Sequence, residues 1–380
     1  MKKKGLEFFD SIARLIEQAR KYVGRTADLT MCVTYFEIGR MIKEEEQGGE
    51  SRAKYGKKLL TELSAYLGDK FGKGFSETNL KNFRKFYQIY APSIQQMASA
   101  ESESSALAPI RQILSAESER STLVPIRQTL SAGLNPFKLG WSHYQILMRI
   151  ENEQERRFYE IEAAKEQWSV KQLSRQVGSS LYERLALSRD KEGVMRLSNE
   201  GQTVEKPQDI LKNPLVLEFL GLEERSKYSE SELEQALIDN MQKFLLELGK
   251  GFLFEARQKR FTFDEQHFFV DLVFYNRLLQ CYVIIDLKTD ELKHQDLGQM
   301  QMYVNYFDRH IKQDFEKPTV GILLCKKQND SIVELTLPKD ANIYASAYSL
   351  YLPDKALLQR KLAEWVEEFE ETHGDQGDEV

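Results

Sequence analysis

The sequence is poor in the residues that cross-link small domains or hold zinc. It contains three cysteines and five histidines among 380 residues, and none of them forms a Cys-x-x-Cys or a His-Glu-x-x-His motif. These counts argue against a disulfide framework and against a zinc site, and they are typical of a protein kept in a reducing compartment. We therefore expect a cytoplasmic protein.

Long apolar runs are absent as well. No segment approaches the roughly 18 consecutive apolar residues that a transmembrane helix requires. Glu7 and Asp10 interrupt the basic N-terminal segment before a signal-peptide core can form. A hydrophobic fraction of 41% still suffices for sizeable cores, and 380 residues exceed the size at which a single core stops growing. The sequence predicts two globular domains and no membrane partner.

The chain has little excess charge, −6 overall, but that charge is unevenly distributed. Residues 361–380 contain one basic and eight acidic residues, so the rest of the chain is close to neutral. Residues 51–90 carry nine Lys or Arg against three acids, a local charge of +6. A basic stretch of this kind suits the phosphates of nucleic acid, and a solvated helix face is the alternative interpretation.

The N-terminal half has apolar side chains at helical spacing, which predicts an all-α domain over residues 1–188. A helix at 57–70 and a second helix begun by Ser76 flank a glycine-containing turn, the arrangement of a helix-turn-helix. We expect Pro92 to end the second helix. Helix pairs of this kind also occur in proteins that never bind DNA. The candidate DNA contacts on the second helix are Lys81, Arg84 and Lys85.

A duplication lies between the helical segments. Residues 101–132 consist of two 16-residue copies that match at twelve positions, and residues 94–100 resemble a third copy. Short Ser-rich units in such small number do not build a solenoid, so we expect a loop insertion over 94–132. The other expected boundaries are a linker with a short apolar segment at 189–226, a second domain at 227–360 and an acidic tail at 361–380.

The second domain has the pattern of a mixed α/β fold. Ser229 and Glu232 form a capping box that predicts the start of a helix. Runs of β-branched and aromatic residues separated by polar turns predict several strands after it. The expected order is a helix at 230–248, strands at 252–261, 267–276 and 280–288, a helix at 293–310 and a strand at 319–326.

Two aspartates stand where apolar residues are expected. Asp271 interrupts the apolar run 268–275, and Asp286 interrupts the run 283–287. An ionised carboxylate in an apolar strand is costly unless it is paired or binds a metal ion. Strand alternation places Asp286 and Lys288 on one face, and an adjacent strand brings Asp271 alongside.

Two neighbouring carboxylates repel each other, which favours a divalent cation between them. Oxygen ligands without His or Cys indicate Mg²⁺, or Mn²⁺, rather than zinc. A lysine beside such a site can orient or deprotonate an attacking water and neutralise a phosphate oxygen. Asp-x-Lys is a common tripeptide, so a structural Asp–Lys pair at a strand end is the alternative.

The full order of elements is more specific than the tripeptide. An acidic helix, a strand carrying Asp271, an apolar Asp-x-Lys strand and a helix containing GQMQMY together resemble the PD-(D/E)XK nuclease superfamily. The resemblance implies a restriction-endonuclease-like α/β domain with a mixed central sheet. It implies that Asp271 and Asp286 hold the metal ion and that Lys288 serves the attacking water. Gln299 and Tyr303 match the Q-x-x-x-Y element of the RecB-like branch on the last helix.

The same resemblance indicates further site residues. Glu234 is similar to the helical glutamate of the superfamily and is the third candidate metal ligand, whereas Glu230 and Glu232 suit the positive end of the helix. Cations on the first strand lie where a phosphate backbone can run, and a solvated sheet edge is the alternative. These candidate nucleic-acid contacts are Arg257, Lys259 and Arg260.

Nearly the whole chain also resembles the YhcG-like bacterial nucleases, which join an N-terminal helical domain to a PD-(D/E)XK domain. The segments that carry the similarity include 55–87, 139–144 and 217–222, whereas 94–132 and the acidic tail lie outside it. The resemblance implies a Mg²⁺-dependent DNA endonuclease, with RNA as an alternative substrate. The rival hypotheses are a non-catalytic nucleic-acid-binding module and an adaptor in a restriction or defence assembly. A homodimer is compatible with each.

Overall fold

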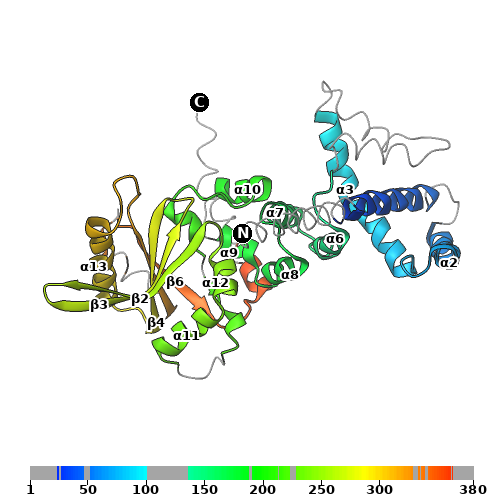
Figure 1. Ribbon diagram of the computed structural model, residues 1–380. Coiled ribbons are helices and arrows are strands. Elements are labelled where there is room, and N and C mark those ends of the chain that lie inside the picture. Colours follow the sequence, from blue (N-terminus) through cyan, green and yellow to red (C-terminus); the bar gives the residue numbers. More distant parts are fainter. Residues whose placement is uncertain are drawn as a thin grey trace, which may run out of the picture. The chain divides into compact units, whose positions relative to one another are not determined.

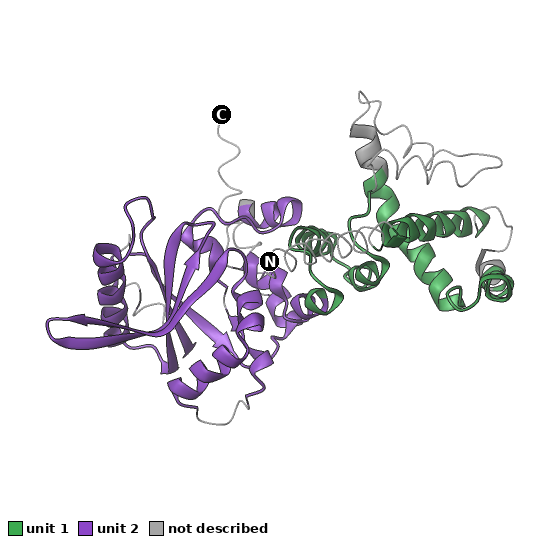
Figure 2. Cartoon of the chain, viewed as in Figure 1, with its two compact units in different colours: residues 1–173 green, residues 174–380 purple. Residues whose placement is uncertain are grey.

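The chain divides into two compact units, residues 1–173 and 174–380 (Figure 2). The predicted duplication at 101–132 and all of the predicted acidic tail except residue 362 lie outside the part that the structure describes. The computed structural model describes residues 24, 27–46, 52–100, 136–187, 191–212, 214–222, 228–327, 333, 335–338, 341–360 and 362.

The described part of the first unit is helical, as the sequence predicts (Figure 1). None of the described helices in either unit is long and apolar enough to cross a membrane. The helices of this unit are residues 27–46, α2 (Arg52–Phe71), α3 (Glu77–Ala100), α6 (Trp141–Leu147), α7 (Glu153–Lys165) and the first residues of α8 (Val170–Gly178).

Aromatic side chains form the core of the first unit. Phe83 of α3 is fully buried, stacks on Tyr35 at a centroid distance of 4.2 Å and lies 5.2 Å from Trp141. Gly39 permits this contact, because a Cβ atom there would lie 2.1 Å from the carbonyl oxygen of Phe83. The close approach of helix 27–46 to α3 therefore requires glycine.

Two expectations are wrong, one about the end of a helix and one about the start of the loop insertion. The second helix does not end at Pro92 but continues through it to Ala100, so residues 94–100, expected as the start of the loop insertion, are helical. Ala91 and Ile94 beside this proline are buried, so packing offsets the hydrogen bond that proline removes. The expected linker also contains regular structure, since α10 (Lys191–Glu200) occupies most of its first half.

The second unit is built on a mixed six-stranded sheet among its described residues, in the order β1-β6-β5-β4-β3-β2. The strands β2, β3 and β4 are antiparallel neighbours, and the other pairs are parallel. Two of the strands, β1 and β6, were not expected from the sequence. The strands are β1 (Leu215–Val216), β2 (Phe252–Phe263), β3 (Gln266–Asn276), β4 (Cys281–Glu291), β5 (Val320–Lys327) and β6 (Ile343–Ser349).

Helices cover both faces of this sheet (Figure 1). Strand alternation divides the core as expected: Val283 and Ile285 of β4 pack against α11 and α12, whereas Ile284 packs against α13. The expected single helix at 230–248 is broken at Asn240 into α11 and α12. The helices of this unit are α9 (Leu181–Ala186), α10, η2 (Pro207–Ile210), η3 (Glu218–Leu220), α11 (Glu230–Asp239), α12 (Met241–Leu248) and α13 (His294–His310).

Gly321 of β5 allows α13 to pack closely on the sheet. A Cβ atom at this position would lie 2.7 Å from the sulfur of Met300 and 2.9 Å from a methyl group of Val304. Both side chains are buried in the core that joins α13 to the sheet. A larger residue at position 321 must therefore push the helix away or force a new rotamer.

We expect Gly321→Ala to lower the free energy of unfolding by about 1–3 kcal/mol, because it overpacks this contact. The matched control is Gly298→Ala on α13 itself, where a Cβ atom meets nothing within 4 Å. That change should leave stability equal or raise it by up to about 1 kcal/mol through helix propensity. Urea unfolding of both variants measures the difference, and equal effects would contradict the packing argument.

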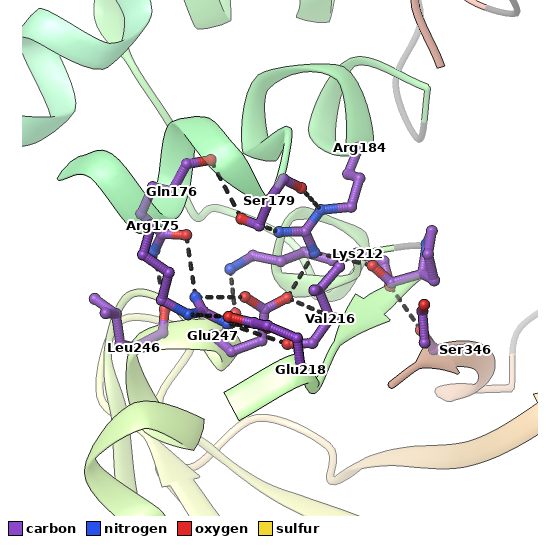
Figure 3. A network of polar contacts seen from close by, with 12 residues as sticks. Arg175, Gln176, Ser179, Arg184, Lys212, Val216, Glu218, Leu246, Glu247 and Ser346 are labelled. Atoms are coloured by element: carbon purple, nitrogen blue, oxygen red, sulfur yellow. Dashed lines mark hydrogen bonds and ion pairs between the residues drawn. The ribbon is translucent and has the colours of Figure 1, made fainter. Parts of the chain in front are cut away.

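A buried ion cluster ties the start of the second unit to its sheet (Figure 3). The carboxylate of Glu247 is fully inaccessible and receives Arg184 Nη1 at 2.5 Å, Arg175 Nη1 at 3.1 Å and the backbone N–H of Val216 at 2.9 Å. Lys212 donates to the backbone carbonyl of Glu247. These contacts join the consecutive helices α8 and α9 to β1 and α12, which lie farther along the chain.

The surplus of cations decides the protonation of Glu247. Burial by itself raises the pKa of this carboxyl group, but Arg184, Lys212 and Arg175 outweigh burial and lower the pKa to about 2. A carboxyl group with a lowered pKa in the folded state stabilises that state above the pKa of the unfolded chain. This stabilisation is lost as the pH falls through the pKa of the folded state.

The second unit should therefore lose roughly 3 kcal/mol of stability between about pH 4.5 and pH 2 on account of Glu247 alone. Glu247→Gln should remove that part of the acid dependence and destabilise the unit at pH 7 by about 3–5 kcal/mol, since it removes the buried negative charge that Arg184 and Arg175 face. Denaturant unfolding across this pH range is the measurement.

Glu205→Gln is the matched control for this prediction. Glu205 pairs with Arg196 at 3.4 Å on the surface, and such pairs contribute about 1 kcal/mol or less. An acid dependence that is the same in Glu247→Gln and in the unaltered chain would show that Glu247 is not the titrating group.

Candidate active site

Asp271 and Asp286 lie next to each other where β3 and β4 separate. The ladder between these antiparallel strands ends at the pair Leu272–Ile285, and the two aspartates are the next residue on each strand. Asp271 Oδ2 accepts a hydrogen bond of 2.8 Å from the backbone N–H of Leu287. The side chain of Asp271 thus accepts the backbone N–H of β4 beyond the last strand pair. This hydrogen bond holds the Asp271 carboxylate beside that of Asp286.

Asp286 is almost completely buried, with 3% of its surface exposed, and it faces Lys288. Lys288 Nζ lies 2.8 Å from Asp286 Oδ2 and 3.6 Å from a carboxylate oxygen of Glu230. Burial and then the negative charge of Asp271 raise the pKa of Asp286 above its usual value, although Lys288 opposes this shift. The site holds more negative charge than its own cation neutralises.

Lys288 is held as an ammonium ion. Burial lowers the pKa of this amine, but the charge of Asp286 and the hydrogen bond between the two groups outweigh burial, so the pKa lies above its usual value. An ammonium group at this place can donate hydrogen bonds and neutralise an anion. The arrangement favours these roles over the removal of a proton from water.

Glu234 and Asp271 are linked through Gln258. The side-chain amide of Gln258 donates to Glu234 Oε2 at 2.6 Å and to Asp271 Oδ1 at 2.8 Å. Glu234 Oε1 lies 3.0 Å from Arg257 Nε. The structure therefore brings Glu234 to the site but engages both of its oxygens with β2.

Gln299 and Tyr303 face the same region from α13. They are four residues apart on one face of the helix, and the Gln299 amide donates to the Tyr303 hydroxyl. Tyr303 is buried, and burial raises the pKa of its hydroxyl. The negative charges of Asp286 and Asp271 raise it further, which places this hydroxyl within their electrostatic reach.

The cations predicted to contact nucleic acid differ in exposure and in whether they already pair with a protein side chain. On β2, Arg257 pairs with Glu234, Lys259 pairs with Glu255, and Arg260 donates to the ring of His267. In the first unit, Lys85 is exposed on α3, Lys81 is exposed but lies 3.7 Å from a carboxylate oxygen of Glu77, and Arg84 is half-buried and paired with Glu46. The α3 face that is open to an anion is therefore narrower than the sequence suggests.

No three His, Cys, Asp or Glu side chains in the described part of the chain come together in a way that could hold a metal ion. The closest approach to a ligand set is the pair Asp271 and Asp286. Both offer carboxylate oxygens, and the raised pKa of buried Asp286 shows that added positive charge would be favourable there. The chemistry of this donor set fits Mg²⁺ or Mn²⁺.

Gln258 is a site residue that the sequence interpretation missed. Its φ of +43° lies in the left-handed region, which is unfavourable for a residue with a side chain, and such strain collects at functional sites. The position of the turn between β2 and β3 could have indicated Gln258. A two-residue turn at Asp264–Glu265 sets the hairpin register, and counting back from it places Gln258 opposite Asp271.

We expect Gln258→Ala and Gln258→Gly both to lower nuclease activity, because each removes the amide that holds Asp271. Gln258→Gly should be more stable than Gln258→Ala by about 1 kcal/mol, since glycine adopts a positive φ without strain. Thermal unfolding and a cleavage assay on the same samples test both parts.

Gln280→Gly is the matched control, because Gln280 has a φ of +55° in an exposed turn. This variant should gain stability while keeping full activity. If Gln258→Ala cleaves as well as the unaltered chain, Gln258 has no part in positioning Asp271.

Comparisons with known proteins identify the family of this chain. Residues 208–363 match the family described as the YhcG PDDEXK nuclease domain, and residues 11–184 match the DUF1016 N-terminal domain. These matches define a nuclease of the PDDEXK type that carries a helical N-terminal domain. The chain is 39% identical to the Escherichia coli (strain K12) protein named "Putative nuclease YhcG", over 94% of this chain and 93% of that protein. The chain belongs to the YhcG family.

Two solved structures resemble part of the chain. A repair endonuclease from Pyrococcus abyssi is 18% identical and covers 34% of this chain and 50% of its own, with a TM-score of 0.24. The EndoMS-dsDNA2 complex is 15% identical and covers 35% of this chain and 51% of its own, with a TM-score of 0.25. At these TM-scores neither structure adds to the assignment.

Proposed function

We propose that this nuclease is a metal-dependent endonuclease that hydrolyses phosphodiester bonds in DNA at Asp271, Asp286 and Lys288. The observation that carries the proposal is the arrangement of two adjacent carboxylates, one of them buried, with an ammonium group 2.8 Å from the buried one. A buried site with surplus negative charge is costly for a purely structural role. It is suited to a site that receives a cation.

Asp271 and Asp286 are the residues that would hold a divalent cation, Mg²⁺ or Mn²⁺. A bound ion of this kind lowers the pKa of water and stabilises the charge that develops on the phosphate. Glu234 stays a predicted third ligand, and its contact with Gln258 supports a second role, holding that amide against Asp271.

Lys288 would act on the phosphate and the attacking water as a hydrogen-bond donor. Its ammonium group is positioned by Asp286 and can stabilise the negative charge that increases on the phosphate oxygens as the water attacks. The pair Gln299 and Tyr303 supplies further polar groups on the α13 side of the site. These can orient the water or a phosphate oxygen.

Cations of both units would bind the phosphate backbone of the substrate. Arg257, Lys259 and Arg260 lie on the strand that also carries Gln258, and Lys81 and Lys85 are exposed on α3. RNA remains the alternative substrate. The homodimer, the restriction or defence partners, the helix-turn-helix role of α3 and the cytoplasmic location stay predictions.

We expect Asp271→Asn, Asp286→Asn and Lys288→Met each to lower cleavage by roughly a hundredfold or more, since each removes a contact that stabilises the transition state. The assay uses supercoiled, linear, single-stranded and branched DNA and single-stranded RNA, with Mg²⁺, Mn²⁺ or EDTA. Asp290→Asn, an exposed acid on the same strand, is the matched control and should keep its activity.

Cleavage that persists in EDTA or in Asp271→Asn would end this mechanism. Calorimetry separates it from a non-catalytic scaffold that merely binds nucleic acid. The proposal expects Mg²⁺ binding by the unaltered chain that is lost in Asp286→Asn. A chain that binds nucleic acid but neither binds Mg²⁺ nor cuts any substrate would favour the scaffold.

A further inference from the structure

A second feature of the nuclease unit is a cavity at the open edge of the sheet. It has a volume of about 350 Å³, which lies within the range of about 300–1,000 Å³ common for small-ligand sites. The edge strand β2 and the C-terminal half of α13 form its walls. The lining residues are Lys259, Arg260, Phe261, Thr262, Tyr306, Phe307 and Ile311.

An ordered stack of aromatic rings ends at this cavity. Phe261 is parallel to Phe268 at 5.4 Å and to Tyr306 at 4.0 Å, with interplanar angles of 25° and 18°. Phe261 in the middle of the stack is buried, whereas Phe268 and Tyr306 at its two ends are both half-buried. Of these two ends, Tyr306 is the one that lines the cavity. His310 lies 5.0 Å from the Tyr306 ring and is itself exposed. A flat ring fixed in this way is a platform on which a nucleobase can stack.

The cavity also has positive charge, and none of the described residues that line it is acidic. Lys259 is paired with Glu255 and lies 5.9 Å from the ring of Phe307. Arg260 donates to a ring nitrogen of His267 at 3.0 Å, and an imidazole acceptor leaves the guanidinium charge in place. Arginine can bind a phosphate through two parallel hydrogen bonds.

The cavity is connected to the candidate active site through direct ring contact. Phe261 meets Tyr303 edge-on at 5.5 Å, with an interplanar angle of 86°. Tyr306 follows Tyr303 by three residues and lies on the next turn of α13. A group bound against Tyr306 is therefore held on the same helix that carries Gln299 and Tyr303.

We propose that this cavity binds one unpaired nucleotide of the substrate, with its base stacked on Tyr306 and its phosphate held by Arg260 and Lys259. The inference rests on the proposed nuclease function and adds a substrate class to it. A base inside a duplex is stacked on both faces and cannot enter a walled cavity unless it leaves the helix. The cavity thus selects strands with unpaired nucleotides, such as single strands, flaps or branches.

Fluorescence of an oligonucleotide that contains 2-aminopurine tests this proposal, with the full chain in EDTA so that no cleavage occurs. The single-stranded probe should lose fluorescence on binding. The same sequence in a blunt duplex, where 2-aminopurine is already stacked between its neighbours, should bind more weakly and show no further loss. Tyr306→Ala should weaken binding of the single strand by about tenfold and abolish the quenching. Arg260→Gln should weaken binding and flatten its dependence on salt.

Two further variants keep the test sharp. Tyr306→Phe retains the ring and should bind like the unaltered chain, which separates stacking from a packing defect. Tyr351→Ala removes an exposed tyrosine that does not line the cavity and should change nothing. Thermal unfolding of every variant confirms that each is folded.

Equal binding of single strand and duplex, or full affinity and quenching in folded Tyr306→Ala, would overturn the cavity assignment even if the chain cuts DNA. Failure of the unaltered chain to cut any substrate with Mg²⁺ or Mn²⁺ would overturn the nuclease mechanism. The fluorescence binding measurements are made in EDTA, without metal. They therefore test the cavity assignment independently of the cleavage assay.

Discussion

Buried carboxylates are the constraint on which the nuclease unit depends, because each must meet a cation within an apolar interior. Glu247 meets a surplus of cations, and its pKa is lowered to about 2. Asp286 meets Lys288 but also the charge of Asp271, and its pKa is raised. The first carboxylate is satisfied by the protein alone and serves the fold. The second needs further positive charge, which is the physical mark of a site that binds a cation.

The fold around Asp286 is built to keep that site in place. Gly321 lets α13 approach the sheet, so Gln299 and Tyr303 reach the region of the aspartates. On the opposite side, Gln258 takes a strained backbone conformation and places one amide against two carboxylates. The close packing of α13 and the strained backbone of Gln258 thus both position side chains near the point where β3 and β4 separate. The cation-lined cavity beside Phe261 extends this polar region along α13.

Much of the fold was predictable because it rests on local patterns. The central helices and strands of the nuclease unit, and the helical first unit, follow from apolar periodicity. The break at Asn240, the passage of α3 through Pro92 and the strands β1 and β6 did not, because packing partners distant in the sequence decide them. Leu215 and Val216 form a strand only because Tyr348 and Ser349 of β6 lie beside them. Asp271, Asp286 and Lys288 could be proposed as site residues because a charged residue in an apolar strand requires an explanation, whereas Gln258 can be added to the candidate site only once the hairpin register is known.

The sequence by itself determined which residues alternate and where charge interrupts apolar strands, since these are properties of neighbours along the chain. It also determined the class, because the order of acidic helix, Asp strand, Asp-x-Lys strand and Gln/Tyr helix is a linear pattern. Only the tertiary structure decided that Glu234 reaches Asp271 through Gln258, that Arg84 is occupied by Glu46 and that Tyr306 ends an aromatic stack at a cavity. Distances between segments remote in sequence set these contacts, and no local pattern encodes them.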